Sequence, residues 1–349
     1  MAKVGIMTGG ADSPGLNAAI RAVTLRAIRK YGMEVVGILR GWRGLIDGLY
    51  TNLTEDSVEG IMNRGGTILR ISRTNPYRDP RDVESLCENY RQLDLEGLIV
   101  VGGAKTLSVA TRLYREEGLK VVGIPKTIDN DVEGTDFSFG FNSAINVAME
   151  AIDRIHTTAE SHDRVMVVEV MGHHAGWIAM YAGLAGAADV ILVPEHPVSI
   201  EEVCDTIVEI HNRGRDFTIA VVAEGARVTY DANPQGLTIR QDDSLDEFED
   251  VRLGGIGTTL GQEIEARTGY ETRVTKLGHI QRGGQPTAFD RVLATRFGLM
   301  AVDLVDRNSF GRMVSLQGGH VTDVDIALAS LSVKTIPEEL YEAARAFFG

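Results

Sequence analysis

Short runs of consecutive apolar residues, rich in valine and isoleucine, constrain the fold of this chain more than any other feature. They are Val4–Met7, Val35–Ile38, Leu98–Val101 and Val121–Ile124, followed later by Val165–Met171, Val190–Val193, Ile219–Ala223 and Val274–Leu277. Strands with one face in water alternate apolar and polar residues, whereas strands covered on both faces of a parallel sheet are apolar at successive positions. The runs therefore predict parallel strands buried between layers of helices.

The stretches between these runs have the spacing of amphipathic helices. After the first run and its glycine turn, Leu16, Ile20, Val23 and Ala27 recur at helical intervals, and Gly32 offers a stop. A strand, a glycine turn and a helix form the repeating unit of α/β proteins. We therefore expect an α/β fold of two Rossmann-like, three-layer lobes with mostly parallel sheets.

The chain has 349 residues, which is too long for one ordinary core and suits two lobes of about 150 residues each. We expect residues 1–140 and about 281–331 to form the first lobe, and residues 141–280 and about 332–349 to form the second. Between Tyr230 and Asp250 the pattern of strands and helices fails, with a turn at 233–236 and an acidic run after it. We interpret that region as a surface excursion.

Acidic side chains outnumber basic ones by 49 to 35, which gives a formal net charge of −14. A field of this sign disfavours general binding to nucleic acid or anionic membranes, although a local basic pocket can still collect a small phosphorylated ligand. No apolar run approaches the roughly 20 residues that span a bilayer, and the N-terminus lacks a signal-peptide pattern. The two cysteines are too few for a disulfide framework. We therefore expect a cytoplasmic protein that acts on small molecules.

Three glycine-rich turns in the N-terminal half are candidate phosphate-binding segments. They hold Gly10 and Ala11, then Gly65 and Gly66 with Arg73 shortly after, and then Gly103, Lys105 and Thr106. Paired glycines let backbone amides approach a phosphate closely, while threonine, arginine and lysine add donors and charge. One such turn is most often only a tight turn, but three together favour a phosphate cradle. None matches GxxxxGK[ST] or GxGxxG, which argues against a Walker P-loop and a dinucleotide-binding fingerprint.

The segment PKTIDND, residues 125–131, directly follows the run that ends at Ile124. Its two aspartates, Asp129 and Asp131, can divide the work at a strand end: one accepts a hydroxyl proton, and the other serves Mg²⁺ directly or through water. Lys126 supplies local positive charge. The alternative for an isolated DND is an Asx-rich turn without chemistry.

Further strand ends carry arginine, histidine and glutamate. These candidates for a sugar-phosphate pocket, with their neighbours, are Arg164, Met171, Gly172, His173, Glu224, Arg273, His279 and Arg282. Arginine and histidine suit the phosphate of a phosphorylated sugar, and a carboxylate such as Glu224 suits its hydroxyl groups. Adjacent side chains such as His173 and His174 diverge, and no nearby spacing completes a zinc site, so we do not expect zinc.

Taken together, the motifs resemble the phosphofructokinase family. The segments GGADSPGLNAAIR, PKTIDND, GFNSA, VVEVMGHHAGWIA, AEGA and LGHIQRGGQPTAFDR have that family's order and spacing, from the first predicted strand to about Gly319. GWRG, SRTNP, PKTIDND and HAGWIA are similar to the bacterial branch that mixes ATP-dependent and pyrophosphate-dependent enzymes. The resemblance implies phosphoryl transfer from pyrophosphate or ATP to the 1-hydroxyl of fructose 6-phosphate. It also implies Mg²⁺ as cofactor and a homo-oligomer, expected to be a tetramer.

The resemblance also implies residue roles. Asp129 would be the base that takes the hydroxyl proton, with Thr127 positioning the reacting group, Lys126 adding charge and Asp131 holding the metal. The implied donor-phosphate residues, in the first lobe, are Gly10, Ala11, Arg73, Gly103, Lys105 and Thr106. The implied sugar-phosphate residues are the strand-end candidates named above, and in such enzymes the counterparts of Arg164 and Arg273 reach across a subunit boundary.

Several positions depart from the family pattern around the phosphate path. Ala11 and Arg70 replace glycines, Ala104 replaces a magnesium carboxylate, and His173 replaces an arginine. Lys105 occupies the position whose usual glycine or aspartate separates ATP users from pyrophosphate users. A long side chain there would fill space that the ATP α-phosphate needs, and its cation would neutralise pyrophosphate, which favours pyrophosphate as donor. The same departures leave two alternatives open: a catalytically weak paralogue that binds sugar phosphate, and a kinase for another sugar phosphate.

Overall fold

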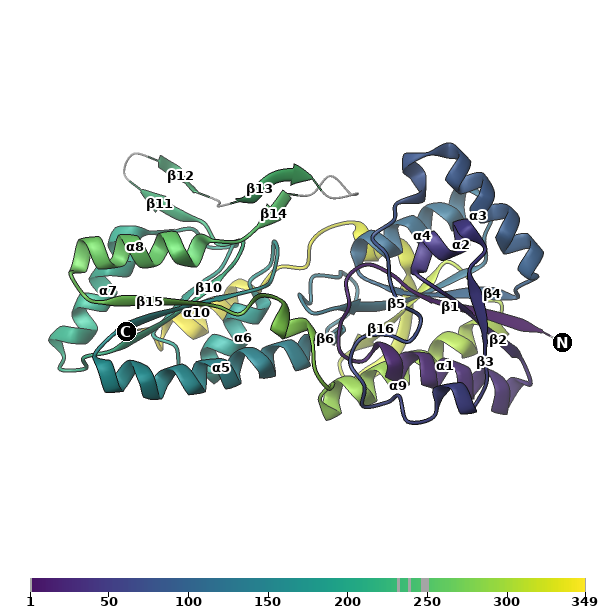
Figure 1. Ribbon diagram of the computed structural model, residues 1–349, viewed down its shortest axis with the longest axis horizontal. Coiled ribbons are helices and arrows are strands. Elements are labelled where there is room, and N and C mark those ends of the chain that lie inside the picture. The colour runs from purple at the N-terminus through teal and green to yellow at the C-terminus, as the bar shows by residue number, and fades with distance from the viewer. Residues whose placement is uncertain (1, 231–232, 238–239, 246–250, 349) are drawn as a thin grey trace. The chain divides into compact units, whose positions relative to one another are not determined.

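The computed structural model describes residues 2–230, 233–237, 240–245 and 251–348 (Figure 1). The chain divides into two compact units. Unit 1 comprises Met1–Ile128, Val132–Ser143 and Arg282–Val333, and unit 2 comprises Asp129–Asp131, Ala144–Gln281 and Lys334–Gly349. Each unit is built on a mostly parallel sheet with helices on both faces, which confirms the predicted α/β fold class.

The sheet of unit 1 has the strand order β17-β16-β5-β4-β1-β2-β3, and β6 pairs with β5. Its strands are β1 (Lys3–Thr8), β2 (Glu34–Ile38), β3 (Tyr50–Leu53), β4 (Gly97–Gly102), β5 (Val121–Thr127), β6 (Phe139–Gly140), β16 (Arg312–Gln317) and β17 (His320–Asp325). The strands predicted from apolar runs, β1, β2, β4 and β5, pair in parallel at its centre. The edge strands β3 and β17 are antiparallel to their neighbours, and the sequence did not predict them because they lack consecutive apolar residues.

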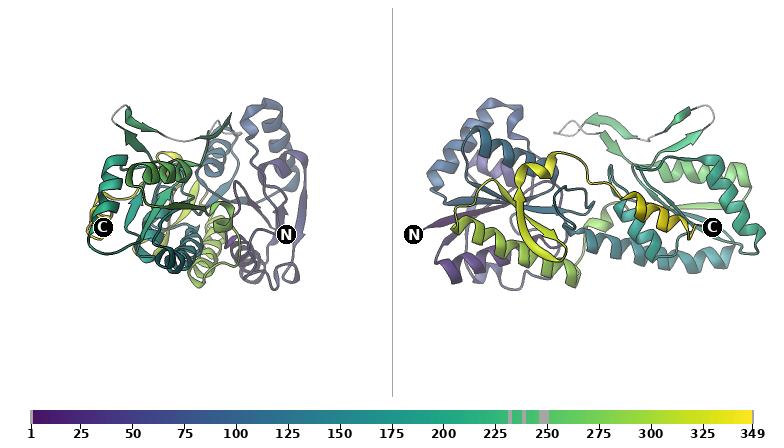
Figure 2. Two further views of the ribbon diagram at one scale, coloured as in Figure 1. Left: turned by 60° about the vertical axis from the view of Figure 1, so that its left-hand side comes forward. Right: turned by 180° about the vertical axis from the view of Figure 1, so that it is seen from behind.

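Helices cover both faces of this sheet (Figure 2). One face carries α1 (Leu16–Tyr31) and α9 (Ala288–Asp306), and the other carries α2 (Gly41–Asp47), α3 (Pro80–Leu93) and α4 (Ala104–Glu116). Short 3₁₀ turns lie at Asp56–Val58, Pro76–Arg78 and Ile326–Ser330. Helix α1 ends at Gly32, which has a φ of 62°, so the predicted stop is confirmed.

Helices α1 and α9 are joined by a carboxylate. The side chain of Asp303, 13% exposed, lies 2.7 Å from Arg26 Nη2, and the hydroxyl of Tyr31 donates to it at 2.6 Å. Burial raises the pKa of Asp303, but the hydrogen bonds from Arg26 and Tyr31 outweigh burial and bring that pKa below its ordinary value. A carboxyl group whose folded pKa is lowered stabilises the fold above its unfolded pKa, and this stabilisation is lost as the pH falls through the folded pKa.

We expect Asp303→Asn to lower the free energy of unfolding at pH 7 by about 1–2 kcal/mol, since hydrogen bonds to a charged group contribute on this scale. Thermal unfolding at pH 7 and at pH 3 measures the effect, and the gap between variant and parent should narrow at the lower pH. Asp306→Asn, at an exposed position of the same helix, is the control. Equal melting temperatures for all three proteins at pH 7 would contradict this prediction.

The sheet of unit 2 has the order β15-β7-β10-β8, and all its strands are parallel. They are β7 (Val165–Val170), β8 (Val190–Leu192), β10 (Thr218–Ala223) and β15 (Thr272–Lys276), as the apolar runs predict. On one face lie α7 (Ile200–Asn212) and α8 (Ile256–Thr268), and on the other lie α5 (Phe141–His162), α6 (Trp177–Ala185) and α10 (Glu338–Arg345). The parallel arrangement places all carboxyl ends of these strands at one edge.

The expected surface excursion contains regular strands. Strands β9 (Val198–Ser199), β11 (Val228–Tyr230) and β12 (Asn233–Leu237) form one small sheet, and β13 (Arg240–Leu245) pairs with β14 (Val251–Leu253). The turn predicted at 233–236 was therefore wrong. Backbone hydrogen bonds between antiparallel strands form without an apolar pattern in the sequence, so the pattern could not reveal them. Residues 246–250 of the acidic run lie outside the described residues.

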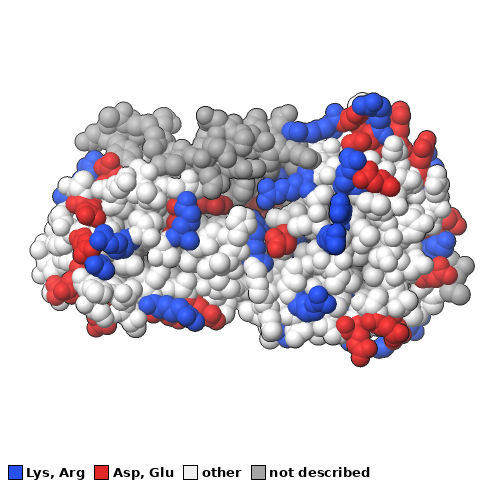
Figure 3. All heavy atoms as spheres, in the orientation of Figure 1, with Lys and Arg blue, Asp and Glu red and all other residues white. Residues whose placement is uncertain are grey.

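Basic and acidic side chains are interspersed on the described part of the face in Figure 3, so that part offers no continuous basic surface. Within the described residues, the structure has no helix that is both long and apolar enough to cross a membrane.

Candidate functional site

Three segments of unit 1 that carry candidate phosphate-binding residues follow strands that are neighbours in the sheet. Strand β4 lies between β1 and β5, so the turn after Thr8, the turn after Gly102 and the end of β5 emerge at one edge. The Gly9 amide donates to Val101 O at 2.9 Å, and a methyl group on Gly9 would lie 2.6 Å from the methyl of buried Thr106. The first and third predicted turns are therefore packed directly against each other.

Lys126 braces the first of these turns from β5. The side chain is almost wholly buried, at 3% exposure, and Nζ donates to Gly9 O at 3.2 Å and to Ala11 O. Gly10, between these two acceptors, has a φ of 77°, a conformation that favours glycine. Carbonyl acceptors reduce the cost of burying a lysine. The backbone contacts of Lys126 thus fix the shape of the turn.

The second predicted turn is tied to the end of β1. The Thr8 hydroxyl donates to Arg70 O at 3.0 Å and lies 3.1 Å from Thr67 Oγ1. Arg70 has a positive φ of 58°. Arg73, three residues further along the chain, has an exposed side chain. Both arginines therefore belong to a loop anchored beside the first turn.

Lys105 stands in the first turn of α4, a helix of 13 residues. The helix begins directly after Gly103, whose carbonyl accepts from Leu107 N at 3.0 Å. The first amides of a helix have no partner within the helix, and its N-terminus attracts anions. The cation of Lys105 and these amides thus add positive charge to the same strand end.

Arg282 belongs to unit 1, whereas the other sugar-phosphate candidates with which the sequence analysis groups it belong to unit 2. Its Nη1 lies 3.5 Å from Asp12 O, in the first glycine-rich turn. Its Nε is buried and has no hydrogen-bond partner among the residues that the structure describes. Arg282 therefore places a guanidinium group beside the first turn.

In unit 2, one edge of the sheet gathers several candidates for sugar binding. Met171, Gly172 and His173 follow β7, Glu224 follows β10, and His279 follows β15. Glu224 Oε1 accepts from the His173 amide at 3.2 Å, and a methyl group on Gly225 would lie only 1.9 Å from His173 O. The strand ends of β7 and β10 are thus held in close contact by Glu224 and by the missing side chain at Gly225.

The sequence analysis missed Glu169, which connects this edge to α8. Its side chain is 2% exposed and accepts from the amides of Gly255 and Gly257 at 3.0 Å and 2.9 Å. Lys276 Nζ at the end of β15 lies 3.3 Å from the same carboxylate. A glutamate inside the otherwise apolar run Val165–Val170 was the available signal, because buried charges are paired or hydrogen-bonded.

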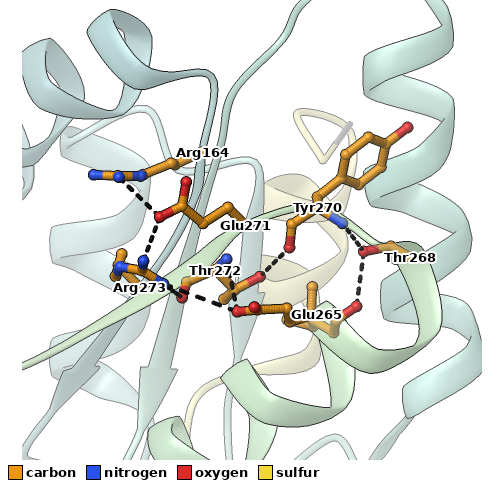
Figure 4. Close-up of polar contacts among 8 residues, drawn as sticks. Arg164, Glu265, Thr268, Tyr270, Glu271, Thr272 and Arg273 are labelled. Atoms are coloured by element: carbon orange, nitrogen blue, oxygen red, sulfur yellow. Dashed lines mark hydrogen bonds and ion pairs between the residues drawn. The ribbon is translucent and has the colours of Figure 1, made fainter.

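Arg164 and Arg273 lie at the opposite edge of the same sheet (Figure 4). Arg164 precedes β7, and Arg273 is the second residue of β15. The six residues of β7 separate Arg164 from Met171, which corresponds to about 20 Å along an extended strand. The sugar-binding candidates of unit 2 therefore form two sets, one at the carboxyl edge of the sheet and one at the amino edge. Within one copy of the chain, the two sets are too far apart to contact the same ligand.

The PKTIDND segment forms the end of β5 and the turn after it. Thr127 belongs to unit 1 and Asp129–Asp131 to unit 2. The Asp129 side chain is 8% exposed, Asn130 has a φ of 51°, and Asp131 O accepts from Lys334 N at 3.0 Å. Across the described ranges, no three or more histidine, cysteine, aspartate or glutamate side chains are arranged to hold a metal ion.

Comparison with known proteins decides the family. Residues 3–305 match the family described as Phosphofructokinase. The chain belongs to the phosphofructokinase family. The resemblance seen in the sequence motifs is thereby confirmed.

Relatives of this chain include enzymes named for both donors. A protein of Streptomyces coelicolor named pyrophosphate–fructose 6-phosphate 1-phosphotransferase is 51% identical over 347 residues, which cover 99% of this chain and 100% of that protein. An ATP-dependent 6-phosphofructokinase of Spirochaeta thermophila is 46% identical over 354 residues, covering 98% and 95%. The structure of phosphofructokinase from Saccharomyces cerevisiae has a TM-score of 0.81 at 29% identity, covering 94% of this chain and 44% of that one.

Proposed function

We propose that this chain transfers a phosphoryl group to the 1-hydroxyl of fructose 6-phosphate, from pyrophosphate in preference to ATP. The observation that carries the proposal is the 51% identity, over 99% of the chain, to a pyrophosphate–fructose 6-phosphate 1-phosphotransferase. Relatives named for ATP are also similar over nearly the whole chain, so the family supports both donors. Lys105 is the feature of this chain that favours pyrophosphate.

Unit 1 is proposed to bind the donor. The groups proposed to bind its phosphates are backbone amides and side chains of the glycine-rich turns and the loop after them, namely those of Gly10, Ala11, Arg73, Gly103, Lys105 and Thr106. Phosphoryl transfer depends mainly on positioning and electrostatic stabilisation, so a rigid turn that presents amides contributes directly. The bonds of Lys126 to Gly9 O and Ala11 O support this role.

Unit 2 is proposed to bind the sugar phosphate. At the carboxyl edge, Glu224 would accept hydrogen bonds from sugar hydroxyls, with Met171, Gly172, His173 and His279 around it. At the amino edge, Arg164 and Arg273 would hold a phosphate, since paired guanidinium groups suit its oxygens. Arg282 is proposed to add a further cation to the sugar phosphate, although its Nη1 lies 3.5 Å from Asp12 O in unit 1.

Asp129 is proposed to take the proton of the 1-hydroxyl as its oxygen attacks the transferred phosphorus, with Thr127 positioning the reacting group. The bond between that phosphorus and the leaving phosphate oxygen then breaks. Mg²⁺ commonly takes one or two carboxylates plus substrate phosphate oxygens, and two aspartates in one turn fit this donor set without a protein cage. Asp131 would hold the ion, which neutralises charge on the phosphates when bound.

The test of this function is a donor panel. Fructose 6-phosphate and Mg²⁺ are supplied with pyrophosphate or with ATP, and formation of the bisphosphate is measured. We expect product with pyrophosphate at a higher kcat/KM than with ATP. Absence of product with both donors, alongside measurable sugar-phosphate binding, would favour the catalytically weak paralogue, for which the departures Ala11, Ala104 and His173 are the sequence evidence. Product with another sugar phosphate in place of fructose 6-phosphate would favour a changed acceptor.

We further propose a homo-oligomer, expected to be a tetramer, in which each sugar site takes its carboxyl-edge residues from one copy and its amino-edge arginines from another. The separation of the two sets along β7 supports this arrangement. The cytoplasmic location expected from the sequence stays a prediction.

Mixed assemblies test the shared site. Arg164→Ala and Glu224→Ala should each lower activity, but assemblies that contain both variants should regain part of it, because some sites then receive two intact edges. A mixture of Arg164→Ala with Arg273→Ala is the control and should regain none, since both changes affect the same edge. Co-expression with two affinity tags isolates the mixed species for assay. Equal activity of the two mixtures would contradict a site shared in this way.

A further inference from the structure

Glu271 lies between the two arginines of the amino edge and has no role in the function proposed above. It directly precedes β15, whose register with β7 pairs Thr272 with Val165. The Val165 amide donates to Glu271 O at 3.1 Å. The ladder therefore fixes Glu271 opposite Arg164, as a cross-strand neighbour.

The carboxylate of Glu271 bridges both guanidinium groups through one oxygen. Arg164 Nη2 lies 2.8 Å from Glu271 Oε1, and Arg273 Nη2 donates to the same atom (Figure 4). Glu271 and Arg273 are two residues apart, and side chains at this spacing in an extended strand share a face. The Arg164 guanidinium lowers the pKa of the Glu271 carboxyl below its ordinary value, although burial acts in the opposite direction. Glu271 is therefore ionised near neutral pH, with a cation on either side.

This arrangement leaves donors of the arginines available for a ligand. Glu271 uses one terminal nitrogen of each guanidinium group, and each group has five N–H donors. The Arg164 side chain is 27% exposed and the Arg273 side chain is 52% exposed. Arg273 Nη1 donates to Thr272 O at 3.0 Å, which restrains its direction further. The two guanidinium groups repel each other, and the attraction of both to the shared carboxylate offsets that repulsion.

We propose that Glu271 is a positioning residue that holds Arg164 and Arg273 together as one phosphate-binding pair. The inference rests on the proposed function, which assigns the two arginines to the phosphate of the sugar. Glu271 itself does not touch the ligand. By holding the two arginines in place before the ligand binds, Glu271 lowers the side-chain entropy that they lose on binding.

The opposite reading is that Glu271 competes with phosphate for the arginines. The two readings predict opposite signs when the carboxylate is removed. Positioning predicts weaker binding of the sugar phosphate, whereas competition predicts tighter binding. The geometry favours positioning, because Glu271 bonds one terminal nitrogen of each guanidinium group and leaves other donors on side chains that are 27% exposed for Arg164 and 52% exposed for Arg273.

The test compares Glu271→Ala with Glu271→Gln in the assembled, full-length protein. Glu271→Ala should raise the Kd for fructose 6-phosphate, measured by titration calorimetry, by about fivefold to tenfold, since two partly exposed ion pairs are lost. Glu271→Gln keeps an oxygen that accepts hydrogen bonds and should raise the Kd less. In turnover assays the KM for fructose 6-phosphate should rise in parallel, with kcat and the KM for the donor within about twofold of the parent.

Glu263→Ala is the matched control, since it removes a carboxylate of α8 that pairs with a different arginine, Arg267, at 3.1 Å. Its Kd for fructose 6-phosphate should equal that of the parent. A Glu271→Ala protein that binds the sugar phosphate as tightly as the parent, or more tightly, would overturn the inference. Because calorimetry measures binding without turnover, absence of product from the parent protein would count against the proposed function and not against the role of Glu271.

Discussion

Replacing Asp129 with alanine is expected to lower kcat by about 10²–10⁴-fold, the usual contribution of a positioned general base. The reason is that the 1-hydroxyl of the sugar would keep its proton and attack the transferred phosphorus poorly. Asp129→Asn should have an effect of similar size, because the amide has the shape of the carboxylate and no basic oxygen. Steady-state assays with the preferred donor measure the loss.

The control for Asp129 is binding of the sugar phosphate. The Kd for fructose 6-phosphate should stay close to that of the parent in both variants, since the proposed binding residues are unchanged. Asp136→Ala, at an exposed position further along the same loop, should leave kcat unchanged. Wild-type rates in Asp129→Ala would show that another group takes the proton.

Replacing Lys105 with glycine is expected to shift the donor preference from pyrophosphate towards ATP. Loss of a charged group that contacts phosphate costs about 1.5–3 kcal/mol, so kcat/KM with pyrophosphate should fall by about tenfold to a hundredfold. Removal of the long side chain from the first turn of α4 should make room for the α-phosphate of ATP, and kcat/KM with ATP should rise. The same coupled assay with the two donors gives both values.

Lys105→Arg is the companion variant, because it keeps both the charge and a long side chain. It should retain preference for pyrophosphate, with a moderate loss from the different geometry of the guanidinium group. If the ratio of the two kcat/KM values is the same in the parent, Lys105→Gly and Lys105→Arg, the lysine does not select the donor.

The fold could be predicted from the sequence wherever burial on both faces leaves consecutive apolar residues. Strands β1, β4, β7 and β10 are of this kind and lie inside their sheets. Strand β3 begins with three exposed residues, and β12 lies in a segment with no apolar run. These two strands form because their backbones pair with a neighbouring strand, and a local sequence pattern does not predict that pairing.

For the candidate site, the sequence indicates residue types and their nearness to strand ends, but the pattern does not state which edge each side chain occupies. The predicted run Val165–Met171 already separates Arg164 from Met171, but only the parallel register of β15 with β7 places Arg273 at the same edge as Arg164. Lys126 was expected to supply charge, and the structure adds its bonds to the backbone of the first turn. The sequence signal for Glu271 is its two-residue spacing to Arg273, since side chains at that spacing share one face of a strand.

A crystal structure of the chain with fructose 6-phosphate bound tests the central claim most directly, by the distance from the sugar 1-hydroxyl to the Asp129 carboxylate. We expect the two oxygens within hydrogen-bond reach, at about 2.6–3.2 Å or through one water. A sugar whose 1-hydroxyl points away from Asp129, with no bridging water, would contradict the account.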